Sequence, residues 1–157
     1  GYLRATRFDF VKFGLLINLV LSSNAAIGEQ MKEEFKRMQP CPASPNCVSS
    51  LTEIPSKYIQ PLRSQNEAGL LIDAIVVLLQ QDASFSIVVN EAGYVRAEAR
   101  TRLFRFVDDL EFQIRLNSGY VDIRSGSRMG FSDLGKNRRR MEALRRNLIH
   151  MQAVTPE

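Results

Sequence analysis

Residues 94–116 read YVRAEARTRLFRFVDDLEFQIRL and carry the clearest structural signal in this chain of 157 residues. In the first half of the stretch, Val95, Ala97 and Ala99 alternate with polar and charged residues. In the second half the apolar positions are Phe104, Phe106, Leu110, Phe112, Ile114 and Leu116. Because successive side chains on a strand point to opposite faces, this period of two predicts strands over residues 94–102 and 104–116, each with one buried face.

The sequence on either side extends this pattern into a sheet. Residues 84–90 predict a strand before the turn at 91–93, and residues 120–125 predict another strand after the turn at 117–119. Short turns between successive strands are typical of an antiparallel meander with one face in water. The prolines between residues 40 and 61 predict that residues 40–66 form a loop without regular structure.

Helical periodicity brackets the predicted strands. Residues 67–81 carry a wide apolar stripe that begins at Leu70 and Leu71, and residues 136–151 repeat Met141, Leu144 and Leu148 at helical spacing. The order of elements predicts the α+β class. We expect a curled antiparallel sheet of about four strands, packed by two or more helices and preceded by an N-terminal extension helix.

The N-terminal segment resembles an export or thylakoid-transfer signal. Arg4, Arg7 and Lys12 precede an apolar run at residues 13–21, and small residues follow at 22–26. The run is shorter than a transmembrane helix requires. We therefore expect residues 1–39 to form an anchor helix that lies on a membrane or packs against a membrane partner, with an ordinary buried helix as the alternative. Residues 40–157 are expected to form the α+β domain, and Gly1 in place of Met suggests a processed product or a fragment.

The composition excludes several kinds of site. The chain has one histidine, two cysteines and a net charge of +4. That supply of ligands makes most zinc sites hard to build, so we predict no metal and no cofactor. The basic helix at residues 136–146 lacks an accompanying RNA-stacking aromatic motif, so we expect no nucleic-acid partner and keep anionic lipid as a candidate partner.

Three carboxylates lie close together in the second predicted strand. Asp109 and Glu111 share one face of that strand, whereas Asp108 points to the apolar face. A carboxylate buried there must be hydrogen-bonded or paired. The cluster can be interpreted as a cation site or an acid–base pair, or as a set of partners for the arginines of the chain. We favour the pairing with arginines.

Glycines, serines and arginines alternate in residues 124–140, RSGSRMGFSDLGKNRRR, just before the last helix. Backbone amides at a helix start beside arginines suit a phosphate, sulfate or carboxylate group. In the structural alternative, Asp133 caps the loop or helix, Gly135 permits the turn and the arginines pair with the three carboxylates. The candidate ligand-binding residues are Asp108, Asp109, Glu111, Arg124, Arg128, Asp133, Asn137 and Arg138.

The two cysteines bracket two prolines in residues 41–50, CPASPNCVSS. A metal clip would need two further ligands, and a catalytic dithiol usually has two residues between its cysteines. A lone reactive thiol would have no histidine nearby in the sequence. The spacing therefore favours a disulfide between Cys41 and Cys47, which would persist in an oxidising compartment.

Three segments together resemble a known family. CPASPNCVSS, YVRAEARTRLFRFVDDLEF and VDIRSGSRMGFSDLGKNRRRMEALR, in this order, resemble the family called domain of unknown function 1499, found in bacteria and chloroplasts, over residues 40–146. The resemblance implies a compact domain in the periplasm, in the thylakoid lumen or on a membrane, often behind a signal or membrane helices. It implies no particular activity.

These observations lead to two functional hypotheses. We expect a non-catalytic accessory or assembly subunit that binds a membrane protein complex through residues 1–39. The layout, together with the occurrence of the resembled family in chloroplasts, suggests a photosystem in a chloroplast thylakoid, with a bacterial periplasm as the alternative location. The competing hypothesis is a lumenal or periplasmic enzyme, or a binder of a small anionic ligand at the Asp/Glu–Arg cluster.

Overall fold

The computed structural model describes residues 38–101 and 106–156. The chain divides into two units, residues 1–37 and 38–157, and the described residues belong to the second unit. The expected anchor helix therefore lies outside the described residues, apart from Met38 and Gln39, which are not helical.

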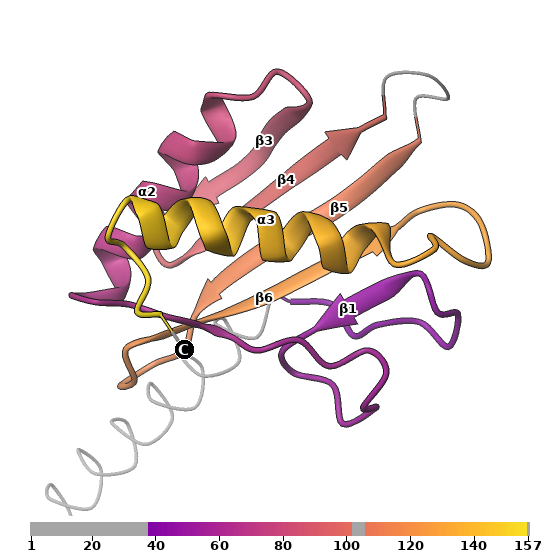
Figure 1. Ribbon diagram of the computed structural model, residues 1–157, viewed down its shortest axis with the longest axis horizontal. Coiled ribbons are helices and arrows are strands. Elements are labelled where there is room, and N and C mark those ends of the chain that lie inside the picture. The colour runs from indigo at the N-terminus through magenta and orange to yellow at the C-terminus, as the bar shows by residue number, and fades with distance from the viewer. Residues whose placement is uncertain (1–37, 102–105, 157) are drawn as a thin grey trace, which may run out of the picture. The chain divides into compact units, whose positions relative to one another are not determined.

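The described part of the chain forms a six-stranded antiparallel sheet with two helices, and this confirms the α+β class. The helices α2 (Ala68–Gln80) and α3 (Lys136–His150) pack on the same face of the sheet, here called the helix face (Figure 1). The strands run in the order β1-β6-β5-β4-β3, and β2 pairs with β6 beside β1. Their bounds are β1 Cys47–Ser49, β2 Leu62–Arg63, β3 Phe85–Glu91, β4 Tyr94–Arg100, β5 Val107–Ile114 and β6 Tyr120–Ser127.

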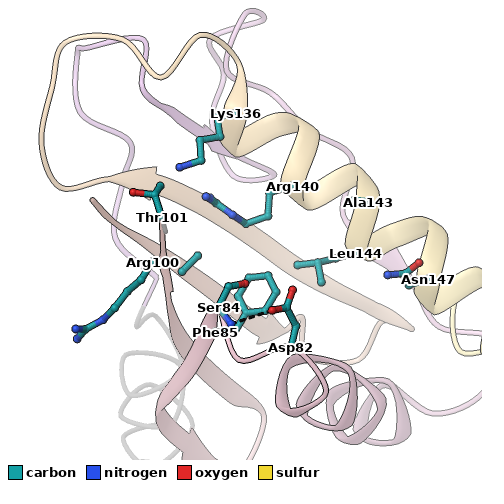
Figure 2. Close-up of a pocket in the computed structure, with 11 residues that line it drawn as sticks. Asp82, Ser84, Phe85, Arg100, Thr101, Lys136, Arg140, Ala143, Leu144 and Asn147 are labelled. Carbon is teal, nitrogen blue, oxygen red and sulfur yellow. Dashed lines mark hydrogen bonds between the residues drawn. The ribbon is translucent and has the colours of Figure 1, made fainter. Parts of the chain in front are cut away.

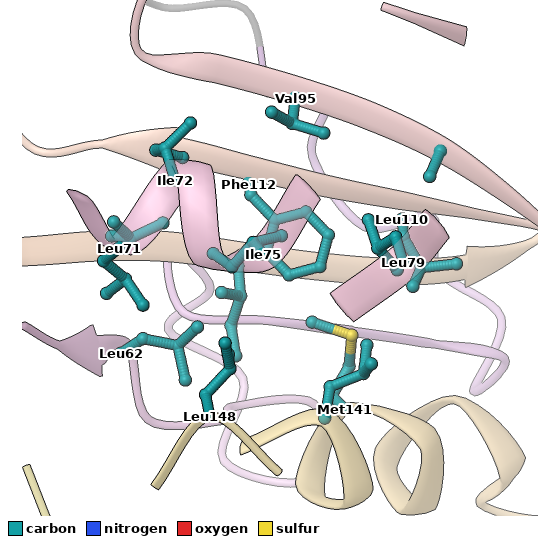
Figure 3. Close-up of a cluster of buried hydrophobic side chains, with 14 of the residues drawn as sticks. Leu62, Leu71, Ile72, Ile75, Leu79, Val95, Leu110, Phe112, Met141 and Leu148 are labelled. Atoms are coloured by element: carbon teal, nitrogen blue, oxygen red, sulfur yellow. The ribbon is translucent and has the colours of Figure 1, made fainter. Parts of the chain in front are cut away.

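The alternation of apolar residues places the core on the helix face as predicted. Val95 and Ala97 of β4 pack beside Leu110 and Phe112 of β5, and all four side chains are buried. Side chains of α2 and α3, such as Ile75, cover these strand residues on the helix face (Figure 3). The opposite face of the sheet, here called the polar face, carries most of the charged residues of the same strands.

The sheet differs from the prediction in strand number and in curvature. It has six strands rather than about four, and it is not strongly curled. The two additional strands lie in the proline-rich segment that was expected to be irregular. The prolines flank these strands instead of entering them, and strands of three and two residues are too short to show a period of two.

Three apolar residues predicted to be in the core are exposed instead. Leu70 lies outside the packed stripe of α2 because that helix is apolar nearly all round, and the stripe facing the sheet includes Ile72. Phe106 and Leu116 lie just beyond the two ends of β5, so neither is covered by the helices. Within residues 38–101 and 106–156, no helix combines the length and apolarity that a bilayer span requires.

Candidate functional site

Pairing between strands brings the three sequence motifs together. Cys47 of β1 is opposite Gly126 of β6, and Gly126 is opposite Asp109 of β5. The segments 41–50, 106–111 and 124–138 therefore meet across three neighbouring strands. Their side chains are divided between the two faces of the sheet because successive strand residues alternate.

On the helix face, Asn137 is the centre of a buried hydrogen-bond network. Its Oδ1 accepts from Ser125 Oγ at 2.6 Å and from Arg140 Nη1 at 2.8 Å. Its Nδ2 donates to the Asn46 carbonyl and to Ser127 Oγ, both at 2.9 Å. Asn137 thus ties the first turn of α3 to β6 and to the residue before β1 with all four of its amide hydrogen bonds.

Asp108 lies on the same face, as its position in the strand predicts. Its side chain is 2% exposed, and Arg140 Nη2 donates to its Oδ2 at 2.5 Å, with Lys136 Nζ at 3.4 Å. Burial by itself raises the pKa of Asp108, but hydrogen bonds from Ser127 and Arg140 and the two cationic charges outweigh it. The net pKa lies below the ordinary value, so Asp108 is an ionised partner of α3 at neutral pH.

On the polar face, Glu111 is equally buried and is also paired. Arg124 Nη1 donates to its Oε1 at 2.5 Å, while Tyr94 Oη donates to its Oε2 at 3.0 Å. The backbone amide of Gln39 donates to the same Oε2 at 3.2 Å. Glu111 therefore fastens the start of the described chain to the middle of the sheet.

The Tyr94–Glu111 contact predicts a stability change at high pH. Burial, followed by the charge of Glu111 and its hydrogen bond, raises the pKa of Tyr94 from 10.0 to about 12. This contribution to folding is fully present below the ordinary tyrosine pKa, and it is lost as the pH rises through about 12. Between neutral and strongly alkaline pH, the wild type should lose unfolding free energy on the order of 2 kcal/mol through Tyr94. Tyr94→Phe should not show this loss, because phenylalanine does not titrate. Urea unfolding over this pH range measures the difference. Tyr58→Phe, at an exposed tyrosine, is the control, and an unchanged alkaline slope in Tyr94→Phe would contradict the prediction.

Arg128 joins two strands at the exposed edge of the polar face. Its guanidinium donates to both carboxylate oxygens of Asp109, at 2.8 and 2.7 Å, and to Glu98 at 2.6 Å. These bonds raise the pKa of Arg128, and the bonds from Arg128 and Arg100 lower the pKa of Glu98. Because Arg128 is exposed, solvent screens these pairs and their contribution to stability is small.

The predicted disulfide between Cys41 and Cys47 is present, with a Cα–Cα distance of 5.6 Å. The disulfide explains why residue 126, between Ser125 and Ser127, is a glycine. A Cβ on Gly126 would lie 3.2 Å from Cys47 Sγ, closer than most side-chain contacts. The glycine therefore makes room for the disulfide on the neighbouring strand.

Replacing Cys41 and Cys47 with serine together is expected to lower the free energy of unfolding by about 2 kcal/mol, because the short loop is no longer closed in the unfolded chain. Urea unfolding of the oxidised protein and of the double variant measures the difference. Dithiothreitol should lower the stability of the wild type and leave the double variant unchanged. Equal stability of the oxidised wild type and the double variant would contradict the prediction.

The loop before α3 is organised by Asp133, as the structural alternative predicts. Its carboxylate accepts from the backbone amides of Gly135 at 3.0 Å and Asn137 at 2.7 Å. Gly135 has a φ of +75°, a backbone conformation that glycine adopts without strain. Arg138 projects elsewhere and donates to the carbonyls of Ser56 and Tyr58.

The eight candidate residues are therefore brought near one another but not into one cleft. On the polar face lie Asp109, Glu111, Arg124 and Arg128, whereas on the helix face or at the start of α3 lie Asp108, Asp133, Asn137 and Arg138. The expected pairing of the acidic cluster with arginines is confirmed. Ligand binding by any of these residues stays a prediction.

Sequence reasoning missed several members of the helix-face network. Arg140 was not among the candidate residues although it is the main partner of Asp108. Asn46 belongs to the cysteine motif, and its Nδ2 donates to the Gly130 carbonyl at 2.6 Å. The signal that could have found Arg140 is its spacing of four residues from Lys136, which places both cations on one side of α3.

Two hollows flank Lys136. One, of about 360 Å³, lies between α3 and the ends of β3 and β4, and Lys136 and Arg140 project into it (Figure 2). The other, of about 530 Å³, lies beside the loop that precedes α3 and is mostly apolar, with Phe106, Met129 and Leu134 in its wall. Among the described residues, no group of three histidine, cysteine, aspartate or glutamate side chains is placed to hold a metal ion.

The fold and the motifs define a small disulfide-bonded α+β domain with a buried polar network between the start of α3 and the sheet. Residues 37–148 match the family described as protein of unknown function (DUF1499), and the match covers well over half of the chain. The chain therefore belongs to the DUF1499 family. No curated protein and no solved structure matches the chain.

Proposed function

We propose that this chain is a non-catalytic accessory or assembly subunit of a membrane protein complex, attached through residues 1–39. A photosystem in a thylakoid is the proposed setting, with the periplasmic face of a bacterial membrane as the alternative. The pairing of the motif carboxylates supports the non-catalytic part of this proposal, and the apolar run at residues 13–21 supports the attachment. Asp108 and Glu111 are each 2% exposed and held by an arginine of the same domain. A general acid or base must reach a substrate proton, and these carboxylates stabilise the fold instead.

The attachment is tested by native gel electrophoresis of membranes solubilised in mild detergent. The wild-type chain is expected to migrate with a large complex. Leu16→Asp should release it, because a charge in the apolar run at residues 13–21 disfavours contact with lipid or an apolar partner. Leu51→Asp, at an exposed position of the domain, is the matched control and should leave migration unchanged. Migration of the wild type only as a small free species would overturn the proposal.

Binding of a small anionic ligand is a second candidate, and the hollow shown in Figure 2 favours it. Lys136, Arg140 and the Thr101 hydroxyl border this space, and Phe85 and Leu144 supply an apolar wall. This combination suits an anion with a short apolar tail, such as an alkyl phosphate.

Calorimetric titration with hexyl phosphate and with inorganic phosphate tests the second candidate. Binding that weakens in Lys136→Met but not in Arg146→Met would support a site in this hollow. Equal heats of binding for the wild type, Lys136→Met and Arg146→Met would exclude an anion site in this hollow.

A further inference from the structure

The loop between β6 and α3 exposes an unusual set of apolar side chains. Met129, Phe131 and Leu134 are 72%, 78% and 84% exposed, the three highest values among the large hydrophobic residues that the structure describes. The loop lies at one end of the domain, beyond the start of α3 (Figure 1). Exposed apolar residues gathered on one segment mark a contact with another apolar phase.

Hydrogen bonds hold this loop in place although its apolar side chains are not buried. Asn46 anchors the Gly130 carbonyl, Asp133 caps the first turn of α3, and Arg139 Nη1 donates to the Leu134 carbonyl at 2.7 Å. Leu134 has a φ of +53°, in the left-handed region that a bulky residue rarely adopts. The domain thus maintains a strained backbone at a position where leucine has no packing role in the fold.

The cations that remain for an external partner lie on the outer side of α3. Residues 128–140 contain five arginines or lysines, of which three pair with carboxylates of β4 and β5, and Arg138 donates to backbone carbonyls. Arg139 is exposed and pairs with no carboxylate among the described residues, and the exposed Arg146 follows it by seven residues on the same side of α3. These cations are available to an external anion.

We infer that this loop is a membrane-contact site, at which Met129, Phe131 and Leu134 enter the interfacial region of a bilayer that contains anionic lipid. Arg139 and Arg146 contact the lipid headgroups. Exposed apolar side chains next to cations are the combination that binds peripheral proteins to anionic membranes. A contact of this kind does not depend on the proposed attachment through residues 1–39, and it would orient the domain on the membrane.

The absence of tryptophan from the sequence gives a direct test with the full-length chain. Phe131→Trp introduces a single reporter on the loop, and Leu70→Trp places one on the exposed side of α2 as the control. With vesicles of phosphatidylcholine and phosphatidylglycerol, we expect the emission of Phe131→Trp to shift to the blue and to be quenched by brominated acyl chains. Pure phosphatidylcholine or high salt should diminish both effects, because salt screens the cations.

Vesicle co-sedimentation of a second variant separates lipid contact from folding. Leu134→Gly removes an exposed apolar side chain and relieves the backbone, so the melting temperature should not fall. Its affinity for anionic vesicles should weaken by about tenfold, the effect of losing much of one leucine from the interface. Leu51→Gly should bind like the wild type.

An unchanged emission of Phe131→Trp on anionic vesicles would overturn the inference, even if the protein sediments with them. Binding would then come from another segment, and the loop would be a surface for a protein. The native-gel result on Leu16→Asp is a separate measurement, so the two proposals can fail independently.

Discussion

Asn137→Ala is expected to lower the free energy of unfolding by about 4 kcal/mol, because several buried polar groups lose their partner. The side chain is fully buried and makes four hydrogen bonds to β6, α3 and the residue before β1. Alanine leaves the Ser125 hydroxyl and the Asn46 carbonyl without this partner in the interior. Each buried polar group that loses its partner costs about 1–3 kcal/mol.

Urea unfolding followed by circular dichroism measures this effect. Asn147→Ala is a matched control, because Asn147 is exposed on the same helix and its replacement should change stability by less than about 0.5 kcal/mol. Asn137→Asp keeps the shape of the side chain but exchanges a donor for an acceptor, and we expect it to be at least as damaging. A loss below about 1 kcal/mol in Asn137→Ala would mean that the network contributes little to folding.

A second large effect is expected for Asp108→Leu, which should lower the free energy of unfolding by about 3–5 kcal/mol. Removing this carboxylate leaves Arg140, whose side chain is only 13% exposed, as a buried charge without its main counterion. Asp109→Leu is the control on the same strand, and it should cost far less because the Arg128 pair is screened by solvent. The double variant Asp108→Leu, Arg140→Met should recover much of the loss, because it removes both members of the pair.

The same pair predicts how stability responds to acid. The pKa of Asp108 is lower in the folded state than its ordinary value, so its contribution is present above that ordinary value and is lost as the pH falls through the folded-state pKa. Unfolding free energies measured from neutral to acidic pH should therefore fall more steeply for the wild type than for Asp108→Leu. Parallel curves would show that Asp108 does not couple proton binding to folding.

Alternation along a strand predicted both an element and its buried face, whereas the apolar pattern of a helix predicted only the element. The alternation at Val95, Ala97 and Ala99 correctly identified a strand and its buried face. The apolar helix α2 was located, but its buried side was not, because apolar residues surround it and only the sheet selects Ile72 over Leu70. The strands β1 and β2 could not be predicted from hydrophobic alternation. They have only three and two residues, and pairing with the edge strand β6 holds them in place.

For the candidate site, the alternation of side chains along a strand was the informative feature. It placed Asp108 on the apolar face, and because a buried carboxylate must be paired, it also predicted a cation beside Asp108. Alternation cannot identify that cation as Arg140, since the distance between the two residues depends on how α3 crosses the sheet. The exposure of Phe131 and Leu134 was likewise invisible, because apolar residues in a loop are as compatible with burial as with solvent.

The amino-acid sequence was therefore sufficient for the α+β class, the disulfide, the family and the face on which each motif carboxylate lies. These properties depend on local periodicity, spacing and residue identity. Tertiary packing decided which groups meet. It divided the motif residues between two faces, gathered Asn46, Asp108 and Asn137 into one network, and left the loop before α3 uncovered. Contacts between residues distant in sequence depend on strand order and helix placement, and no local pattern encodes them.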